Sequence, residues 1–280
     1  MAEREGNPEA PEKVQRKGIP EGMLQVIYAM ANESGREGRY LYDPMAPELV
    51  KRLEGGFQVV NQEALGPVRD SVMGRGALAR AILLDRMTAD YVRRHPQGRI
   101  VNLGCGMDTR FYRVDNGRIR WYDVDLPEVM EARRQLLPED DRVVLIGGSV
   151  SDSVWAEKVE AGPVLILAQR LSMFLDKQKL QKIFKIIRTC FEEAEVYMEI
   201  ASPYTVKNSY ENVDGESRLK YSWGAGSAKE LAAITTGFKA VRDVSLMEGL
   251  KEMYPSYHVL RFFPPLRRMS NKIAVLRREP

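Results

Sequence analysis

A glycine pair and two acids are the residues of this chain whose spacing most clearly suggests chemistry. Gly104 and Gly106 follow an apolar run, and Asp123 and Asp125 end the next apolar run about twenty residues later. A glycine turn lets the backbone approach a ligand closely, and a helix start behind it offers free N–H groups to an anionic group. An acid at the end of the next strand can accept both hydroxyls of a ribose. The pattern predicts a nucleoside site at the carboxyl edge of a parallel sheet.

The residues around this glycine pair narrow the choice of nucleoside. Gly106 is followed by Met-Asp-Thr-Arg and not by the third glycine of a dinucleotide fingerprint. This argues against NAD and FAD and favours S-adenosylmethionine, whose tail is an amino acid without a pyrophosphate. Cys105 lies inside the turn, where we expect a small apolar filler. Arg110, at the end of the same motif, is expected to anchor the loop by a salt bridge.

The elements that must position these residues follow from the apolar pattern. Residues 20–96 have helix-compatible spacing, and after Gly98 short apolar runs alternate with helix-like pieces. Such alternation is typical of a parallel sheet covered on both faces. The predicted strands are 99–104, 119–125, 141–147, 163–168, 195–201, 238–246 and 271–278. We therefore predict an α/β fold with about seven strands.

Three regions are expected along the chain. Residues 1–18 are charged and contain Pro and Gly, which favours a disordered tail. Residues 19–97 are predicted to form a helical cap, and residues 98–280 the α/β domain. Residues 202–236 are longer than a connection between the fifth and sixth strands needs, so we expect this insertion to cover the substrate.

Composition excludes several classes of protein. The 42 basic and 39 acidic residues leave a net charge of +3 without a dominant basic stripe, which argues against a nucleic-acid binder. Two cysteines cannot build a disulfide framework or a metal cage, so we expect no metal and a reducing cytoplasm. No apolar run approaches the roughly 18 residues of a membrane span, so no membrane partner is expected. The sequence specifies no oligomeric state.

Several motifs in the same order resemble one known family. The stretch from Val101 to Pro138, with LGCGMDTR and then YDVDLP, closely resembles the leucine carboxyl methyltransferase family, and most of all its bacterial polyketide-type O-methyltransferases. The stretch YDPMAPELVKRL is similar to the family's DP-x-A helix, and Arg80 to Asp85 to its Arg-x-x-x-x-Asp helix. The resemblance implies a class I methyltransferase fold, with a Rossmann-like seven-stranded sheet that binds S-adenosylmethionine at its strand ends.

The resemblance also implies roles for individual residues. Arg80 would bind the methionine carboxylate, although a solvent or intrahelical role is the alternative. Asp125 would hold the ribose, and Gln169 would lie near the cofactor's amino group. The full set of expected cofactor-binding residues is Arg80, Gly104, Cys105, Gly106, Asp123, Asp125, Leu126, Ser149, Val150 and Gln169. Many relatives have Glu where Gln169 stands and an acid where Ser149 stands, so this chain loses a charge at each position.

Other residues are candidates for the acceptor side of the site. Arg170 follows the fourth strand, at the edge where ligands bind, and could fork onto a carboxylate or pair with a neighbouring loop acid. His258 is a candidate base, with plain packing as the alternative. These two residues are the catalytic candidates. Tyr204, Tyr210 and Trp223, in the 202–236 insertion, are expected to wall the substrate.

Three functions are compatible with these residues. A carboxylate acceptor is already ionised at neutral pH and needs no base, whereas a phenol benefits from one. The two histidines of the chain therefore mildly favour carboxylate methylation or proximity-driven phenol methylation. We expect an O-methyltransferase for a small molecule. A carboxyl methyltransferase of a protein C-terminus and a non-catalytic S-adenosylmethionine-binding protein are the alternatives.

Overall fold

The computed structural model describes residues 21–53, 71–208, 210–212, 218–260 and 262–279. The predicted tail, 1–18, lies outside these residues. Among them, no helix combines the length and the apolar character needed to cross a membrane.

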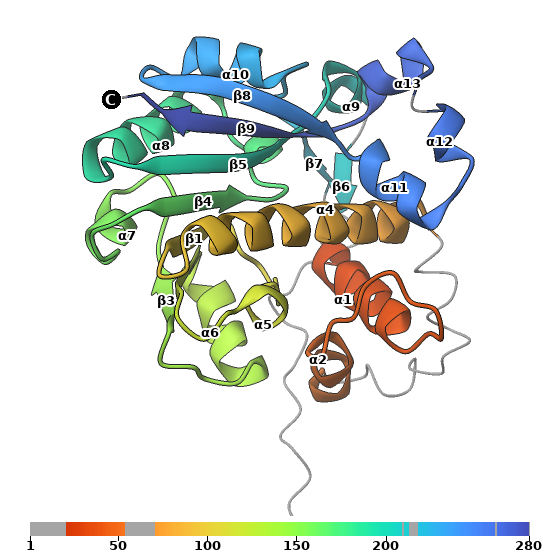
Figure 1. The fold of residues 1–280 in the computed structure, drawn as a ribbon, viewed down its shortest axis with the longest axis horizontal. Coiled ribbons are helices and arrows are strands. Elements are labelled where there is room, and N and C mark those ends of the chain that lie inside the picture. The colour runs from red at the N-terminus through yellow and green to blue at the C-terminus, as the bar shows by residue number, and fades with distance from the viewer. Residues whose placement is uncertain (1–20, 54–70, 209, 213–217, 261, 280) are drawn as a thin grey trace, which may run out of the picture.

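A seven-stranded sheet forms the centre of the molecule (Figure 1). Its strands are β1 (Arg99–Leu103), β2 (Arg120–Asp125), β3 (Val143–Gly147), β4 (Val164–Ala168), β5 (Ala194–Ile200), β8 (Phe238–Ser245) and β9 (Lys272–Arg278). Their order is β3-β2-β1-β4-β5-β9-β8, with β1 to β5 parallel and β9 antiparallel to both neighbours. The seven predicted strands are confirmed. The chain returns through β9 between β5 and β8, an order that the linear pattern of strands does not specify.

Helices cover both faces of this sheet because its strands are apolar on both sides. On one face, Val101 and Leu103 pack with Leu180 and Phe184 of α8 (Lys177–Cys190). α7 (Val154–Glu157) and α10 (Ala228–Ile234) lie on that face too. On the other, Ile100 packs with α4 (Val72–Arg94), α5 (Phe111–Val114) and residue Leu246. α6 (Pro127–Leu136) follows β2 and packs against β3.

β1 and β4 are neighbours in the sheet, and the chain turns in opposite directions from them. From β1 it proceeds to β2 and β3, and from β4 to β5. A switch of this kind opens a crevice at the carboxyl ends of the two strands, where ligands bind in open α/β sheets. The glycine loop, 104–106, and the loop after β4, 169–171, both lie at this crevice.

The N-terminal helices pack over the carboxyl edge of the sheet. α1 (Glu21–Ser34) and α2 (Ala46–Arg52) lie beneath α4 in Figure 1. The three helices share an apolar cluster that includes Leu24, Leu49 and Leu78. α4 contributes to this cluster and to the sheet core, so it joins the cap to the α/β unit.

The 202–236 insertion forms defined elements and not one open loop. It contains α9 (Pro203–Asn208), α10 and a small hairpin of β6 (Tyr210–Asn212) and β7 (Arg218–Lys220). Between β8 and β9 lie α11 (Met247–Met253), α12 (Tyr257–Leu260) and α13 (Pro264–Met269).

Candidate functional site

The glycine loop has the backbone conformation that its residue types favour. Gly104 and Gly106 have φ angles of +63° and +50°, in the left-handed region where a side chain is strained. A Cβ on Gly104 would lie 3.0 Å from Leu171 Cδ1, and one on Gly106 3.1 Å from Met23 Cε. Both glycines therefore allow close packing as well as the turn.

Asp125 closes this loop. Its Oδ2 accepts from the Gly106 N–H at 2.8 Å, and its Oδ1 from the Leu126 N–H at 2.8 Å. Burial raises the pKa of Asp125, against these two hydrogen bonds, which lower it. The carboxylate lies at the carboxyl end of β2, beside the loop, and this placement is compatible with a ribose contact.

Asp123 lies in a different environment from Asp125. It is fully buried, forms an ion pair with Arg133, and accepts from Trp121 Nε1 at 2.9 Å and Asn102 Nδ2 at 3.2 Å. Burial raises the pKa of Asp123, against the opposing effect of Arg133. These partners make it an internal support of β1 and β2, and the structure gives it no place on the cavity surface.

A cavity of about 160 Å³ extends from the glycine loop to the N-terminal helices. Its polar side comes from the loop after β1 and from Gln169 and Arg170. Its apolar side comes largely from α1, where Met23, Val26, Ile27 and Met30 recur at helical spacing. The complete lining is Gly22, Met23, Val26, Ile27, Met30, Asp43, Ala46, Leu49, Ala77, Ala81, Asn102, Gly104–Arg110, Arg113, Gln169, Arg170 and Phe174.

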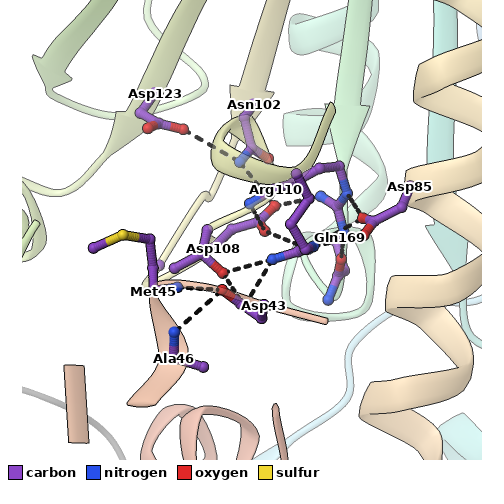
Figure 2. Close-up of polar contacts among 12 residues, drawn as sticks. Asp43, Met45, Ala46, Asp85, Asn102, Asp108, Arg110, Asp123 and Gln169 are labelled. Atoms are coloured by element: carbon purple, nitrogen blue, oxygen red, sulfur yellow. Dashed lines mark hydrogen bonds and ion pairs between the residues drawn. The ribbon is translucent and has the colours of Figure 1, made fainter. Parts of the chain in front are cut away.

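The floor of the cavity is a network of alternating charges (Figure 2). Arg110 Nε donates to Asp85 Oδ1 at 2.9 Å, and its Nη1 pairs with Asp108. Arg113 donates to Asp85 Oδ2 at 2.6 Å and to Asp43 Oδ2 at 2.8 Å. The predicted anchoring of the loop by Arg110 is thus seen.

These ion pairs decide the charge of Asp108. Burial would raise the pKa of this carboxyl, but Arg110 and Arg113 outweigh it and hold the pKa below its ordinary value. Asp108 is therefore a permanent anion at neutral pH and a poor proton acceptor.

Gln169 is oriented by the same network. Its Oε1 accepts from Arg110 Nη2 at 2.7 Å. A guanidinium only donates, so this partner fixes which way the amide faces. The Gln169 Nε2 then remains to donate elsewhere. This favours a contact with an acceptor, such as a carboxylate, over the contact with a cofactor ammonium expected from the sequence.

Arg80 is buried, and one of its nitrogens has a hydrogen-bond partner while another has none among the described residues. Its Nε donates to Glu199 Oε1 and Oε2 at 2.8 and 2.9 Å. Its Nη1 is buried and has no hydrogen-bond partner among the described residues. On α4, Arg80 lies about one helical turn after the cavity-lining Ala77 and directly before Ala81, which also lines the cavity. A buried guanidinium nitrogen without a partner is costly, and a carboxylate ligand would satisfy it.

Arg170 lines the cavity, as expected from its place after β4. Its φ is +52°, and it is the one non-glycine residue with a positive φ in the described part of the chain. Its N–H donates to Glu199 Oε2 at 3.1 Å, and its Nη1 lies 3.0 Å from Met73 Sδ. Strained backbone of this kind is often found at functional sites.

Several expected residues do not reach the cavity. His258 is exposed on α12, and Tyr204 is 51% exposed on α9. Trp223 packs instead against the sheet core: its backbone N–H donates to Met173 O, and its side chain joins the cluster that includes Ala228 and Leu231 of α10. The Tyr210 side chain is outside the described part of the structure. The apolar wall of the cavity therefore comes largely from α1 and not from Tyr204 or Trp223.

Leu126, Ser149 and Val150, which were expected to bind the cofactor, do not line the cavity. Leu126 is 50% exposed next to Asp125. Ser149 is exposed and its Oγ accepts from the Ser151 N–H, while Val150 packs partly into the core. Cys105 is buried against Val129 and Met130, and burial raises the pKa of its thiol well above its ordinary value. The thiol therefore acts as the expected apolar filler, and no metal-binding cluster occurs among the described residues.

Two groups of residues escaped the sequence analysis. Glu199 looks like one more residue of a buried strand, and only the fold reveals that it meets Arg80 and Arg170. The α1 face had a signal, because Met23, Val26, Ile27 and Met30 repeat at helical spacing, but that pattern also describes ordinary core.

The strand order with an antiparallel β9, and the glycine loop at the β1/β4 switch point, define a Rossmann-like methyltransferase fold. Residues 23–188 match the family model described as leucine carboxyl methyltransferase, and the chain belongs to that family. It is an S-adenosylmethionine-dependent methyltransferase.

The similar proteins agree with this class. The tetracenomycin polyketide synthesis O-methyltransferase TcmP of Streptomyces glaucescens is 25% identical over 241 residues, covering 85% of this chain and 87% of TcmP. A protein from Thermobifida fusca YX assigned as a methyltransferase has a similar fold, with a TM-score of 0.55 and 13% identity over 90% of this chain and 94% of its own.

Proposed function

We propose that this protein transfers a methyl group from S-adenosylmethionine to an oxygen of a small molecule with a hydrophobic body. One observation carries the proposal: a single cavity joins the glycine loop to the apolar face of α1. A cofactor held by the loop would present its reactive end to a compartment that suits an apolar acceptor.

The residues at the crevice fit this cofactor. Gly104 and Gly106 allow close approach of the backbone, and Asp125 lies where a ribose would bind. Exposed Leu126 offers an apolar surface for adenine. The buried Nη1 of Arg80, which lacks a partner among the described residues, would hold the methionine carboxylate. Arg80 thus keeps its predicted role in the proposal.

The chemistry requires alignment more than proton transfer. The bound cofactor supplies an electrophilic methyl on a sulfonium, which is a good leaving group. The α1 face excludes water from the acceptor, and Arg170 at the cavity wall can orient an anionic oxygen. The cavity carboxylates Asp43 and Asp108 are held by arginines, and His258 is exposed on α12. We therefore expect an acceptor that enters already ionised, either a carboxylate or an acidic phenol.

The similarity to TcmP supports a polyketide-type acceptor, since that protein acts in tetracenomycin polyketide synthesis and matches along most of both chains. A cytoplasmic reaction is part of the same proposal, because Cys105 and Cys190 are both free thiols.

Two measurements test this function. Calorimetry should detect S-adenosylhomocysteine binding, and a transfer assay with radiolabelled S-adenosylmethionine should show labelled products from aromatic carboxylic acids or phenols. Peptides ending in a free carboxylate form the comparison arm. Labelling of peptides but of no small molecule would replace the proposal by protein carboxyl methylation. Binding without any transfer would favour a non-catalytic role.

A further inference from the structure

Glu199 is a buried carboxylate that contacts the cavity-lining Arg170, and the proposed reaction assigns it no role. It lies near the carboxyl end of β5 and its side chain is fully buried. Its two oxygens accept from Arg80 Nε, from the Arg170 N–H and, at 3.5 Å, from Asn271 Nδ2. Burying a carboxylate is costly, and these donors compensate for it.

The contact with Arg80 determines how that guanidinium faces. Glu199 engages the inner nitrogen, Nε, with both oxygens. The outer nitrogen, Nη1, remains buried without a partner among the described residues. A planar guanidinium held at one nitrogen leaves the rest of its fork for a second partner. Glu199 therefore holds the inner nitrogen of Arg80 and leaves Nη1 for another acceptor.

Glu199 also holds the loop after β4. The Oε2 of Glu199 accepts from the backbone N–H of Arg170, a residue with a left-handed backbone. The backbone carbonyl of Glu199 accepts from Ser172 Oγ at 2.5 Å. Leu171, between these two residues, packs over Gly104, where a Cβ would lie 3.0 Å from Leu171 Cδ1. Glu199 thus forms hydrogen bonds both with Arg80 and with the loop that packs over the glycine turn.

We propose that Glu199 is a positioning residue that orients Arg80 to bind the amino-acid tail of the cofactor. This rests on the proposed function, in which Arg80 holds the methionine carboxylate. Glu199 would touch no reacting atom. Its effect on affinity would be largest for ligands that carry that tail.

Two ligands separate this role from a general structural one. S-adenosylhomocysteine carries the amino-acid tail, and 5′-methylthioadenosine has the same adenine, ribose and sulfur without it. In Glu199→Gln the amide oxygen can serve one donor, but the amide N–H₂ faces the other donor and loosens the Arg80 fork. We expect affinity for S-adenosylhomocysteine to fall by about 10- to 100-fold, the range for a charged hydrogen bond, with 5′-methylthioadenosine nearly unchanged.

Glu195 supplies a matched control on the same strand. It too accepts two hydrogen bonds from an arginine, Arg94, at 2.8 and 2.9 Å, but no residue of this group lines the cavity. Glu195→Gln should leave the affinity ratio of the two ligands at the wild-type value. Equal weakening of both ligands by Glu199→Gln, or no change in either, would overturn the positioning role.

A second pair of variants covers failure of Glu199→Gln to fold. These are Arg80→Met and the double variant Arg80→Met/Glu199→Gln. Neither has a buried guanidinium next to a neutral amide, because Arg80 is gone from both. In the double variant the new amide oxygen can still accept from the Arg170 N–H. We expect the two to bind S-adenosylhomocysteine equally, because Glu199 acts through Arg80. A further loss in the double variant would refute this. Failure of wild type to bind either ligand would remove the proposed function itself.

Discussion

At the scale of single residues, several residues that line the cavity have a left-handed backbone conformation. Gly104, Gly106 and Arg170 all have positive φ and all line the cavity. For Gly the conformation costs little, whereas for Arg170 it costs about 1–2 kcal/mol. The hydrogen bond from the Arg170 N–H to Glu199 helps to offset that cost. Each position brings backbone to where a ligand would lie.

Replacing Gly104 by Ala should damage cofactor binding more than stability. The left-handed φ imposes about 1–2 kcal/mol of strain, and the new Cβ would press on Leu171. Gly117→Ala is the matched control, because its φ is +78° and a Cβ there meets nothing within 4 Å. Urea denaturation should show a loss of stability in both, while calorimetry should show weaker S-adenosylhomocysteine binding only for Gly104→Ala. Equal binding by both would contradict the loop assignment.

Asp125→Asn should weaken the binding of S-adenosylhomocysteine by about 1–3 kcal/mol. One carboxylate oxygen that accepts hydrogen bonds from the loop and from a ribose would be replaced by an amide group that donates. Asp90→Asn, on the exposed face of α4, should bind as wild type does. The measurement is calorimetry on folded protein. Unchanged affinity in Asp125→Asn would remove the ribose role.

At the scale of elements, buried ion pairs join the N-terminal helices to the region of the glycine loop. Asp43 lies between α1 and α2, Asp85 on α4, and Arg113 on α5. Arg113 bonds both acids, and Thr109 Oγ1 donates to Asp43 at 2.5 Å. Removing one partner of a buried pair costs more than the pair contributes, because a charge is stranded. The cap and the glycine loop should therefore unfold together.

Asp108→Asn tests this fastening through its pH dependence. The pKa of Asp108 is held below its ordinary value of 3.8 in the folded protein, so its ionised form stabilises the fold. That contribution is complete above the unfolded pKa and is lost as pH falls through the lower folded pKa. We expect the variant to lose about 3 kcal/mol of unfolding free energy at pH 7. In urea titrations the difference from wild type should shrink below about pH 4; a constant difference would be inconsistent with this role.

The apolar face of α1 should affect the binding of the acceptor and not the binding of the cofactor. Val26→Trp would fill the apolar part of the cavity, so methyl transfer should fall steeply while S-adenosylhomocysteine affinity stays within about threefold of wild type. Val259→Trp, on exposed α12, is the matched control and should keep full activity. The two rates are compared in the transfer assay. Full activity in Val26→Trp would place the acceptor elsewhere.

At the scale of the whole molecule, ligand binding should stabilise the fold selectively. The crevice lies between the cap and the sheet, so a cofactor there contacts both. A ligand at one hundred times its Kd adds about 2.7 kcal/mol to the unfolding free energy. We expect the thermal unfolding temperature to rise with S-adenosylhomocysteine and not with NAD. A comparable rise with NAD, competitive with S-adenosylhomocysteine, would argue against the interpretation of the glycine loop.

Much of the fold was predictable because its signals are local. Continuous apolar runs identified the seven strands, and Gly104, Gly106 and Asp125 marked the crevice, since backbone freedom and strand alternation depend on neighbours in sequence. The charge of Asp108 and the burial of Asp123 were not predictable. Both depend on Arg110, Arg113 and Arg133, whose side chains arrive from the α5 and α6 regions.

The sequence by itself determined the class of fold, the cofactor loop and the family resemblance. Only the tertiary structure decided which residues form the apolar wall of the cavity, that Gln169 turns its oxygen to Arg110, and that Glu199 accepts from Arg80. Arg80 and Glu199 are 119 residues apart along the chain. No local pattern encodes such a contact, because it exists only once β4, β5 and α4 have packed together and excluded the water that would otherwise separate the two charges.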